Sequence, residues 1–455
     1  MDVVTAVKRS SMSPPQYLAV TLCLFCNMLD GFDLFIMGFA LPHLPAGFAS
    51  PSEKGWLVSI GLIGLAVGAI FLAPFADRIG RRKVVTWGLG LGVVSMSATA
   101  MVPGAELMLI TRFVTGLAVG MVSILVIILA QEYASLARRN LCVGLVTLGF
   151  PLGSVVGGFI GLFVINAFGG AWQVLFWSGA ALSMLGLVAS IFWLPESLAF
   201  LVAQRSPVAR DQISRIATRM RLKDVDPNAE PPAEAVQATG EGKTSLVGPR
   251  YRTRSLLIWL GYSCVTVAYF FVSSWTPQLI ATSSGSKETG TLVGTMISVG
   301  SVCGAVIFGI IGIKVLATKF TWVTLIVAVA AQIVFALTLQ GGVAIAAAVL
   351  LGMGAFGALS SYTAAAPPLY PILVRARALG FMYGISRVGA ILAPLAAGYA
   401  LSFVAPVNMY LTASLFLVIA ALAAFVLWRH SKDHFIAERA EISTENAVAA
   451  EPSGS

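Results

Sequence analysis

Charged residues are scarce in this sequence. Of its 455 residues, 58% are hydrophobic and only 11% are charged, whereas about a quarter of the residues in an ordinary soluble domain are charged. This composition excludes a typical water-soluble protein and a disordered chain. Histidine and cysteine are also rare, with three and five residues, and the cysteines all lie in apolar runs. None has metal-ligand spacing with a histidine, so we expect no metal site and no disulfide scaffold.

Motifs of nucleotide-dependent and enzymatic chemistry are lacking as well. The sequence contains no G-x-x-x-x-G-K-[ST] phosphate-binding loop, so we expect no nucleotide and no other cofactor. It shows no nucleophile or metal constellation, which argues against an enzyme. Outside the apolar runs there is one linker and a short tail, which leaves no signalling domain and argues against a receptor.

Long hydrophobic runs dominate instead. A helix needs about 20 predominantly apolar residues to cross a bilayer, and the sequence contains twelve such runs. They predict an all-α integral membrane protein with twelve transmembrane helices. The expected spans are 17–41, 54–76, 83–103, 106–130, 141–166, 172–194, 254–281, 290–312, 320–340, 342–366, 376–404 and 407–428.

The positions of lysine and arginine predict the orientation. Cytoplasmic loops carry an excess of both residues, and all but four of the 29 fall in segments that are cytoplasmic if the N-terminus is cytoplasmic. The exceptions are Lys54 and Lys287 in outer loops, and Arg112 and Arg387 inside spans. We therefore expect both termini in the cytoplasm and the chain in a cell membrane, the inner membrane of a bacterium. The net charge of +9 reflects this distribution, so we expect lipid and not nucleic acid as a partner.

One long polar segment divides the chain into two sets of six spans. It is rich in Pro, Ala, Glu and Gly, which is typical of a flexible linker, with a possible surface helix at 207–221. The expected organisation is a cytoplasmic N-tail 1–16, a six-helix bundle 17–194, a cytoplasmic linker 195–253, a second six-helix bundle 254–428 and a cytoplasmic tail 429–455.

The two halves resemble each other at a nearly constant offset along the chain. Gly64 matches Gly300, and Arg138 matches Arg375 at an offset that differs by a single position. An offset of six spans preserves the direction through the membrane, so the halves form a parallel repeat. Transporters built this way bind their substrate near the midplane, between the repeats.

A charge cluster follows the second expected span, in the segment Ala73-Pro-Phe-Ala-Asp77-Arg78-Ile-Gly80-Arg81-Arg82-Lys. Asp77 lies at the end of a helix, beside the negative end of the helix dipole. Arg78 and its neighbours can compensate this charge, and Gly80 permits a tight turn. A cluster of this kind can stabilise one conformation of a rocking transporter.

The segment closely resembles the G-x-x-x-D-R-x-G-R-R loop of the major facilitator superfamily, with Ala73 in place of the first glycine. The run from Arg112 through Gly116 to Gly120 resembles the superfamily's R-x-x-x-G-x-x-x-G fourth span, and its E-Y-x-x-x-x-x-R loop follows. The resemblance implies the major facilitator fold and a conformational latch. The residues expected to form the latch are Asp77, Arg78, Gly80, Arg81, Arg82, Glu132, Arg138 and Arg375.

Two acidic residues, Asp30 and Asp33, lie in the first expected span. Carboxylates in an apolar span are costly and indicate a functional site, and residues spaced i, i+3 share a helix face. Two close carboxylates do not both ionise easily, so we expect this pair to load and release the coupling proton. The alternative is a structural pair that bonds to backbone groups or to Arg112.

Arg112 and Arg387 are candidate substrate-binding residues, because a guanidinium group binds a carboxylate bidentately. Two alternatives remain open. Arg112 can extend outward to the membrane interface, and Arg387 can serve as a buried partner of Asp30 or Asp33.

The D-G-F-D sequence at 30–33 resembles the aromatic acid:proton symporter branch of the superfamily. The segments 269–277, 370–380 and 386–394 resemble that branch's seventh span, its connection between the tenth and eleventh spans, and its eleventh span. The resemblance implies a benzoate-type anion as substrate. Tyr269 and Trp275 are candidates to stack on its ring, although such aromatic residues also serve packing.

Together these patterns predict a monomeric secondary active transporter. We expect proton-coupled uptake of a small aromatic carboxylate, of the benzoate or hydroxybenzoate class, by alternating access. Two alternatives are a carrier of a non-aromatic organic acid and a drug:proton antiporter. An exporter of cationic drugs would need acidic groups in its cavity and no deep basic residue, so Arg387 argues against it.

Overall fold

A computed structural model describes residues 2–204, 206–220, 251–312, 315–370 and 372–450, and the single positions 222, 226, 246 and 248. Most of the segment 221–250, which is the central part of the predicted linker, therefore lies outside the described residues. The part of this linker that is described contains two short helices, α9 (Leu198–Gln204) and α10 (Pro207–Arg219). The second confirms the surface helix expected at 207–221.

Twelve helices in the described chain are long and apolar enough to cross a membrane, which confirms the predicted number of spans. No strand occurs among the described residues. The long helices are α2 (Pro14–Ala40), α3 (Pro51–Val67), α5 (Arg81–Met101), α6 (Ala105–Tyr133), α7 (Arg139–Ala167), α8 (Gln173–Trp193), α11 (Arg252–Ser284), α12 (Lys287–Ile311), α13 (Ala317–Thr338), α14 (Gly341–Ala365), α15 (Ile372–Ala400) and α16 (Pro406–Ala450).

Short helical segments complete the chain path. The second span continues beyond α3 through η2 (Gly68–Leu72), η3 (Ala73–Phe75) and α4 (Ala76–Ile79). The other short segments are α1 (Val3–Arg9), η1 (Leu41–His43), η4 (Leu136–Arg138) and η7 (Pro367–Leu369).

Local sequence explains where the helices begin. Ser13 and Gln16 form a capping box at the start of α2, and Ser50 and Glu53 form one at the start of α3. Each box satisfies backbone N–H groups that have no partner inside the helix. Pro14 and Pro51 occupy the first helical position, where a missing N–H group costs nothing.

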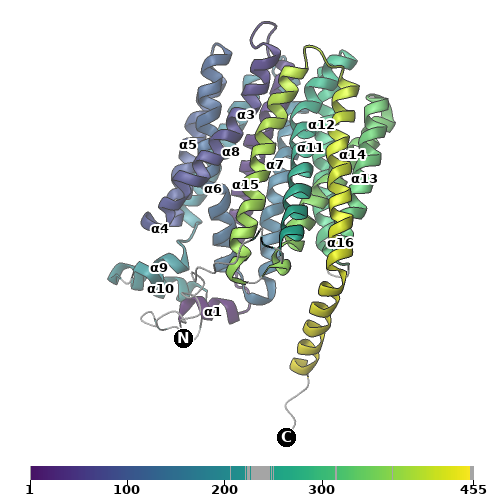
Figure 1. Cartoon of the computed structure of the whole chain (residues 1–455). Coiled ribbons are helices and arrows are strands. Elements are labelled where there is room, and N and C mark those ends of the chain that lie inside the picture. Colours follow the sequence, from purple (N-terminus) through teal and green to yellow (C-terminus); the bar gives the residue numbers. More distant parts are fainter. Residues whose placement is uncertain are drawn as a thin grey trace.

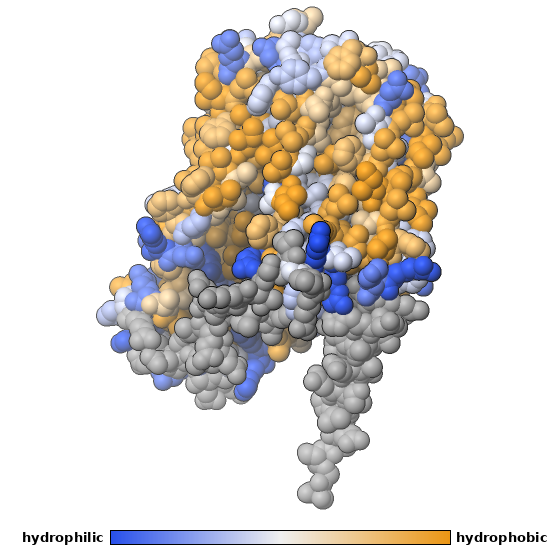
Figure 2. Space-filling view, in the orientation of Figure 1, coloured by the Kyte–Doolittle hydropathy of each residue, from blue (hydrophilic) through white to orange (hydrophobic). Residues whose placement is uncertain are grey.

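Both ends of the chain lie at the same end of the helix bundle, together with α1, α9 and α10 (Figure 1). We call this end the terminal side and the opposite end the distal side. Val3, Val7, Leu198, Leu201 and Ile213 of the three short helices are buried in one hydrophobic cluster with the first six spans. On the face shown in Figure 2, an apolar surface lies between the two ends of the bundle, as expected of side chains that face lipid.

Close helix packing repeats between the halves and confirms the parallel repeat. A Cβ atom added to Gly64 of α3 would meet the carbonyl oxygen of Phe113 in α6 at 2.2 Å. One added to Gly300 of α12 would meet the carbonyl oxygen of Val349 in α14 at 2.0 Å. Phe113 and Val349 are related by the same offset as Gly64 and Gly300. Glycine permits such close approach of two membrane helices, so the predicted offset records the same helix-pair geometry in both halves.

The halves meet on the distal side. Ser59 of α3 donates a hydrogen bond to the carbonyl oxygen of Ile391 in α15 at 2.9 Å. Nearer the distal end, a Cβ atom on Gly398 would lie 2.6 Å from Cα of Gly55. A second distal contact joins α7 and α12, where a Cβ atom on Gly158 would lie 2.3 Å from Thr295 Oγ1.

The same face of α15 is free toward the terminal side. Gly384 and Gly380 precede Ile391 by two and three helical turns, so they lie on the face that contacts α3 farther up. A Cβ atom at either glycine would meet nothing within 4 Å. The halves are therefore in close contact on the distal side, whereas this face of α15 makes no such contact on the terminal side.

Candidate functional site

A trio of charged residues lies inside the N-terminal half. Asp30 and Asp33 of α2 and Arg112 of α6 are exposed by only 3%, 5% and 2%. The Arg112 guanidinium donates a hydrogen bond from Nη2 to the backbone carbonyl of Asp33 at 2.5 Å. It also lies over the ring of Phe176 in α8, with Cζ 5.8 Å from the ring centroid. Arg112 is thus the cation of the Asp30–Asp33 site.

This placement corrects one of the expectations for Arg112. Its side chain does not extend to the membrane interface, because Asp33 and Phe176 hold it among α2, α6 and α8. The trio is incompletely bonded: Asp30 Oδ2, Asp33 Oδ1 and Arg112 Nε are buried and have no hydrogen-bond partner among the described residues. Burying polar atoms without partners costs free energy. The two carboxylate oxygens can therefore accept a proton, and the Nε–H group of Arg112 can donate a new hydrogen bond.

The C-terminal half carries no counterpart of this trio. The offset that relates Phe35 to Phe270 matches Asp30 and Asp33 with Val265 and Ala268. The offset that relates Gly64 to Gly300 matches Arg112 with Ala348. All three of these counterparts are buried apolar residues. Packing is therefore repeated between the halves, but the buried charges are confined to the first.

Arg387 lies in a different environment. It is half-buried on α15, one turn before Ile391, whose carbonyl oxygen accepts the bond from Ser59 of α3. Residues one turn apart share a helix face, so Arg387 lies on the side of α15 that faces the N-terminal half. It has no ion-pair partner among the described residues. In this structure the Asp30–Asp33 pair is not its partner, because Arg112 occupies that place.

Two tyrosines lie near Arg387. Tyr383 precedes it by one turn on the same face of α15, and Tyr262 of α11 packs against Tyr383. The two rings are edge to face, with centroids 5.6 Å apart. The hydroxyl of Thr363, from α14, lies beside both phenols. Residues of three helices of the C-terminal half therefore gather beside the face of α15 that carries Arg387.

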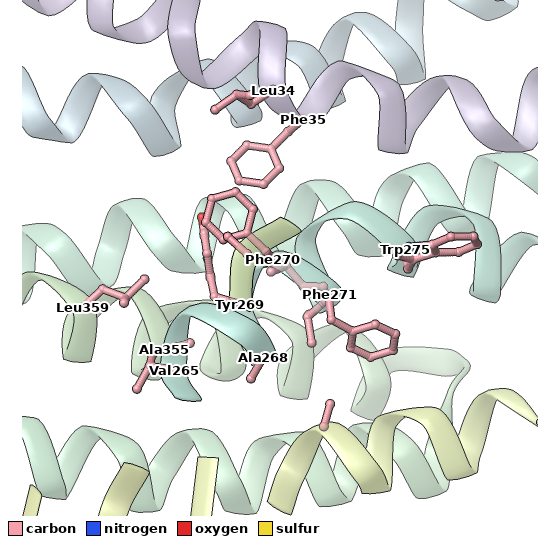
Figure 3. Close-up of a cluster of buried hydrophobic side chains, with 14 of the residues drawn as sticks. Leu34, Phe35, Val265, Ala268, Tyr269, Phe270, Phe271, Trp275, Ala355 and Leu359 are labelled. Carbon is pink, nitrogen blue, oxygen red and sulfur yellow. The ribbon is translucent and has the colours of Figure 1, made fainter. Parts of the chain in front are cut away.

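Aromatic rings connect the two halves near the middle of the bundle. Phe35 of α2 points across to Tyr269 and Phe270 of α11 (Figure 3), with ring centroids 6.0 and 5.7 Å away. Phe150 of α7 packs edge to face against Phe35, with ring centroids 5.5 Å apart. Tyr269, one of the residues predicted to contact a substrate ring, therefore lies where the halves meet, beside a residue of α2 that closely follows Asp33.

Trp275 lies apart from this group (Figure 3). It is fully buried, and its indole N–H donates a hydrogen bond to the carbonyl oxygen of Pro394 at 3.1 Å. Both its ring face and its single donor are engaged in joining α11 to α15. In this conformation Trp275 packs the C-terminal half and presents no free group to a ligand.

The predicted latch residues form a network on the terminal side of the N-terminal half. Arg81 of α5 lies 3.7 Å from Asp77 and is bonded to Glu132 at the end of α6. Ser197 donates to the other carboxylate oxygen of Glu132 at 2.7 Å. The partner of Asp77 is therefore Arg81, one turn away, while Arg78 is exposed.

Glu196 is a member of this network that sequence reasoning missed. Its carboxylate accepts a hydrogen bond from the backbone N–H of Arg82 at 3.0 Å, and its carbonyl oxygen accepts one from the Tyr133 hydroxyl at 2.5 Å. Gly80 adopts a positive φ of 104°, which favours glycine. A Cβ atom there would lie 2.4 Å from the Glu196 carboxylate. The acidic residue directly after the sixth span, in the sequence Pro-Glu-Ser, was the available signal.

The side chains of the remaining latch residues make other contacts. The Arg82 guanidinium donates to the carbonyl oxygen of Ile191, and Arg138 donates to the hydroxyl of Tyr17. Arg375, in the C-terminal half, donates to the carbonyl oxygen of Tyr370 at 3.3 Å. The predicted latch residues therefore fall into two groups. Some belong to a connected network around Glu132 and Glu196, and the others make local contacts elsewhere. Within the described chain, no group of three or more His, Cys, Asp or Glu residues could hold a metal ion.

These features define a membrane carrier with two parallel six-helix halves, with a charged trio enclosed in the first half and a cation on the face of the second half that meets the first. The chain belongs to the Major Facilitator Superfamily, whose family model matches residues 23–372. This confirms the predicted family and the predicted major facilitator fold.

Known relatives and solved structures agree with this family. The chain is 29% identical over 416 residues to a gallate transporter of Pseudomonas putida, covering 88% of this chain and 89% of the relative. It is 31% identical over 397 residues to a 4-hydroxybenzoate transporter of the same species, covering 86% and 88%. Its fold matches an inward-open structure of the xylose transporter XylE from E. coli, with a TM-score of 0.67, 15% sequence identity and 91% of this chain covered. The relatives' names confirm the predicted similarity to aromatic acid transporters.

Proposed function

We propose that this protein takes up a small aromatic carboxylate together with protons. The observation that carries the proposal is the position of Arg387, a half-buried guanidinium without an acidic partner among the described residues, on the side of α15 that faces the N-terminal half. An uncompensated cation inside a membrane protein costs several kcal/mol. A substrate carboxylate that binds it bidentately recovers this free energy.

The aromatic contacts between the halves fit the rest of such a substrate. Phe35 and Tyr269 come from different halves and lie edge to face where the halves meet. Ring edges and faces of this kind are favourable partners for a further aromatic ring. The relatives named as gallate and 4-hydroxybenzoate transporters support an aromatic acid over a non-aromatic one.

Proton coupling belongs to the N-terminal half in this proposal. Asp30, Asp33 and Arg112 carry one positive charge and up to two negative charges, so one proton on the carboxylate pair leaves the trio neutral. Buried groups without compensating charge are costly, so the neutral trio is the form suited to a closed, lipid-embedded bundle. Proton release gives the trio a net negative charge and favours a state in which water reaches it.

We place the terminal side in the cytoplasm of a bacterium, because the loops on that side carry most of the lysine and arginine residues. The structure is then the inward-facing conformation of a monomeric carrier. Substrate would enter from the distal side after the contacts around Ser59 and Gly158 open, and would leave on the terminal side.

A competition assay tests the substrate class. Cells or vesicles that express the chain take up labelled 4-hydroxybenzoate, and unlabelled benzoate competes with its methyl ester. We expect benzoate to inhibit uptake and the ester to compete poorly, because the ester cannot form the ionic contact with Arg387. We expect Arg387→Lys to weaken uptake substantially and Arg387→Ala to nearly abolish it. Equal inhibition by the acid and the ester would refute the assignment of Arg387 to the substrate.

A further inference from the structure

The cation at the interface between the halves is part of a larger polar group from three helices. Arg387 comes from α15, Tyr262 from α11, Thr363 from α14, and Tyr383 lies on α15 one turn before Arg387. Tyr383 is 39% exposed, Thr363 is exposed, and Tyr262 and Arg387 are half-buried. The group is therefore accessible, unlike the enclosed trio of the N-terminal half.

The scaffold fixes the positions of the residues that carry these hydroxyl groups. Thr363 donates its own proton to the carbonyl oxygen of Leu359 at 3.0 Å, which leaves its oxygen lone pairs to accept. Tyr262 is fixed from two directions, because its ring also lies edge to face with Tyr362 at 6.2 Å. Packing therefore fixes the Tyr262 and Tyr383 rings, on the face of α15 that carries Arg387, before any ligand arrives.

Phenol groups provide rotatable O–H donors, which a guanidinium lacks. A tyrosine O–H turns about its C–O bond and can donate to a carboxylate oxygen. Hydrogen bonds to a charged group are stronger than those to a neutral group. Arg387 contributes the charge, and two O–H donors contribute directed bonds to the carboxylate oxygens.

The single positive charge of this group limits the number of carboxylates that a ligand can carry. Arg387 is its one cation, and the other members are neutral hydroxyl groups. The second deep arginine, Arg112, is enclosed and bonded to the backbone of Asp33. A ligand with two carboxylates would therefore have only one of them paired with a cation, and burying the unpaired one when the halves close around the ligand is costly.

We propose that Tyr262 and Tyr383 are specificity-determining residues, which form with Arg387 and Thr363 a receptor for a single carboxylate, so that the carrier accepts aromatic monocarboxylates and rejects aromatic dicarboxylates. This inference rests on the proposed function and extends it to residues and to a charge rule. The geometry also distinguishes these tyrosines from Tyr269, whose ring faces the aromatic contacts between the halves.

Direct binding to the purified full-length protein tests the inference. The probe is labelled 4-hydroxybenzoate at pH 8, and the variants are Tyr262→Phe and Tyr383→Phe. We expect each variant to bind about tenfold or more weakly, the effect of losing one hydrogen bond to a charged group. The matched control is Tyr399→Phe, the same change on the same helix, where the hydroxyl instead accepts a bond from Trp56 at 3.2 Å. We expect this control to bind within about twofold of wild type, since it lacks contact with the receptor.

The second arm compares phthalate with benzoate as competitors of the probe. We expect phthalate to compete at least about 100-fold more weakly than benzoate, the effect of leaving one carboxylate unpaired. Equal competition by the two acids, or unchanged probe binding in both tyrosine variants, would overturn this inference while the proposed function stands. A wild-type protein that binds no aromatic carboxylate at all would overturn both. Thermal melting of each variant shows whether a weaker binder is still folded.

Discussion

Replacing Arg112 with glutamine tests whether the trio in the N-terminal half is held together by charge balance. The substitution leaves Asp30 and Asp33 buried without a cation. The carboxylate that remains ionised must then stay unpaired or take up a second proton. Removing the cation beside a buried carboxylate leaves an uncompensated buried charge, which costs about 3–5 kcal/mol. Protonating an ordinary carboxyl group at pH 7 costs a similar amount, about 4 kcal/mol.

The cost is measurable as thermal stability in detergent. About 2 °C of melting temperature is lost per kcal/mol in a domain of about 200 residues. We therefore expect Arg112→Gln to melt on the order of 8 °C lower than wild type if the N-terminal bundle unfolds as a unit. The double variant Arg112→Gln/Asp33→Asn removes the unpaired carboxylate and should recover most of this loss. A double-mutant cycle over the two positions measures the coupling between them.

Arg387→Gln is the matched control, since it removes the other deep guanidinium. Arg387 has no acidic partner among the described residues, so this variant should lose transport and keep its melting temperature within about 2 °C of wild type. The charge-balance argument would be refuted if Arg112→Gln alone were as stable as wild type. It would also be refuted if the second substitution, at Asp33, lowered the melting temperature further.

Three further predictions concern coupling and conformational change. Uptake into vesicles with an inward-directed proton gradient should collapse when a protonophore is added. Asp30→Asn and Asp33→Asn should each lose concentrative uptake. Uptake that needs sodium and is unaffected by the protonophore would contradict proton coupling. Asp77→Asn should slow transport and leave substrate affinity nearly unchanged, because a latch shifts the balance of conformations; loss of binding by a folded variant would exclude the latch. Gly158→Leu should open the distal side, detected as faster labelling of cysteines placed there, because its side chain would overlap α12. Gly144→Leu, where a Cβ atom meets nothing within 4 Å, is its control, and equal labelling of both would refute the closure.

Much of the architecture follows from the sequence because the bilayer imposes strong local constraints. A backbone that crosses lipid must satisfy its own hydrogen bonds, so twelve apolar runs predicted twelve helices. The constant offset between the halves was also visible, because glycines such as Gly64 and Gly300 are needed where two helix backbones approach closely. These constraints act on residues near one another in the chain or on equivalent positions of a repeat.

The partners of the charged residues were decided by tertiary structure alone. From the sequence, Arg112 and Arg387 were both deep arginines that could pair with Asp30 or Asp33. Packing of α6 against α2 places Arg112 there, 79 positions from Asp33. Arg387 instead lies on the face of α15 that carries Tyr383, which packs against Tyr262 of another helix. The choice depends on how helices rotate about their axes when their side chains interdigitate. Composition and spacing within one helix do not contain that rotation.

The same reason explains why the contacts of Trp275 and Glu196 could not be predicted from the sequence. Both looked ordinary in the sequence, one as an aromatic residue of an apolar span and the other as an acid after one. Contacts across the fold engage Trp275 with Pro394 and bring Glu196 to the start of α5, far from it along the chain. The sequence by itself determined which segments enter the membrane and which residues carry charge there. Only the packed helices decided which of these charges are enclosed, which face the other half and which side of the carrier is closed, because those properties belong to pairs of helices and not to any one of them.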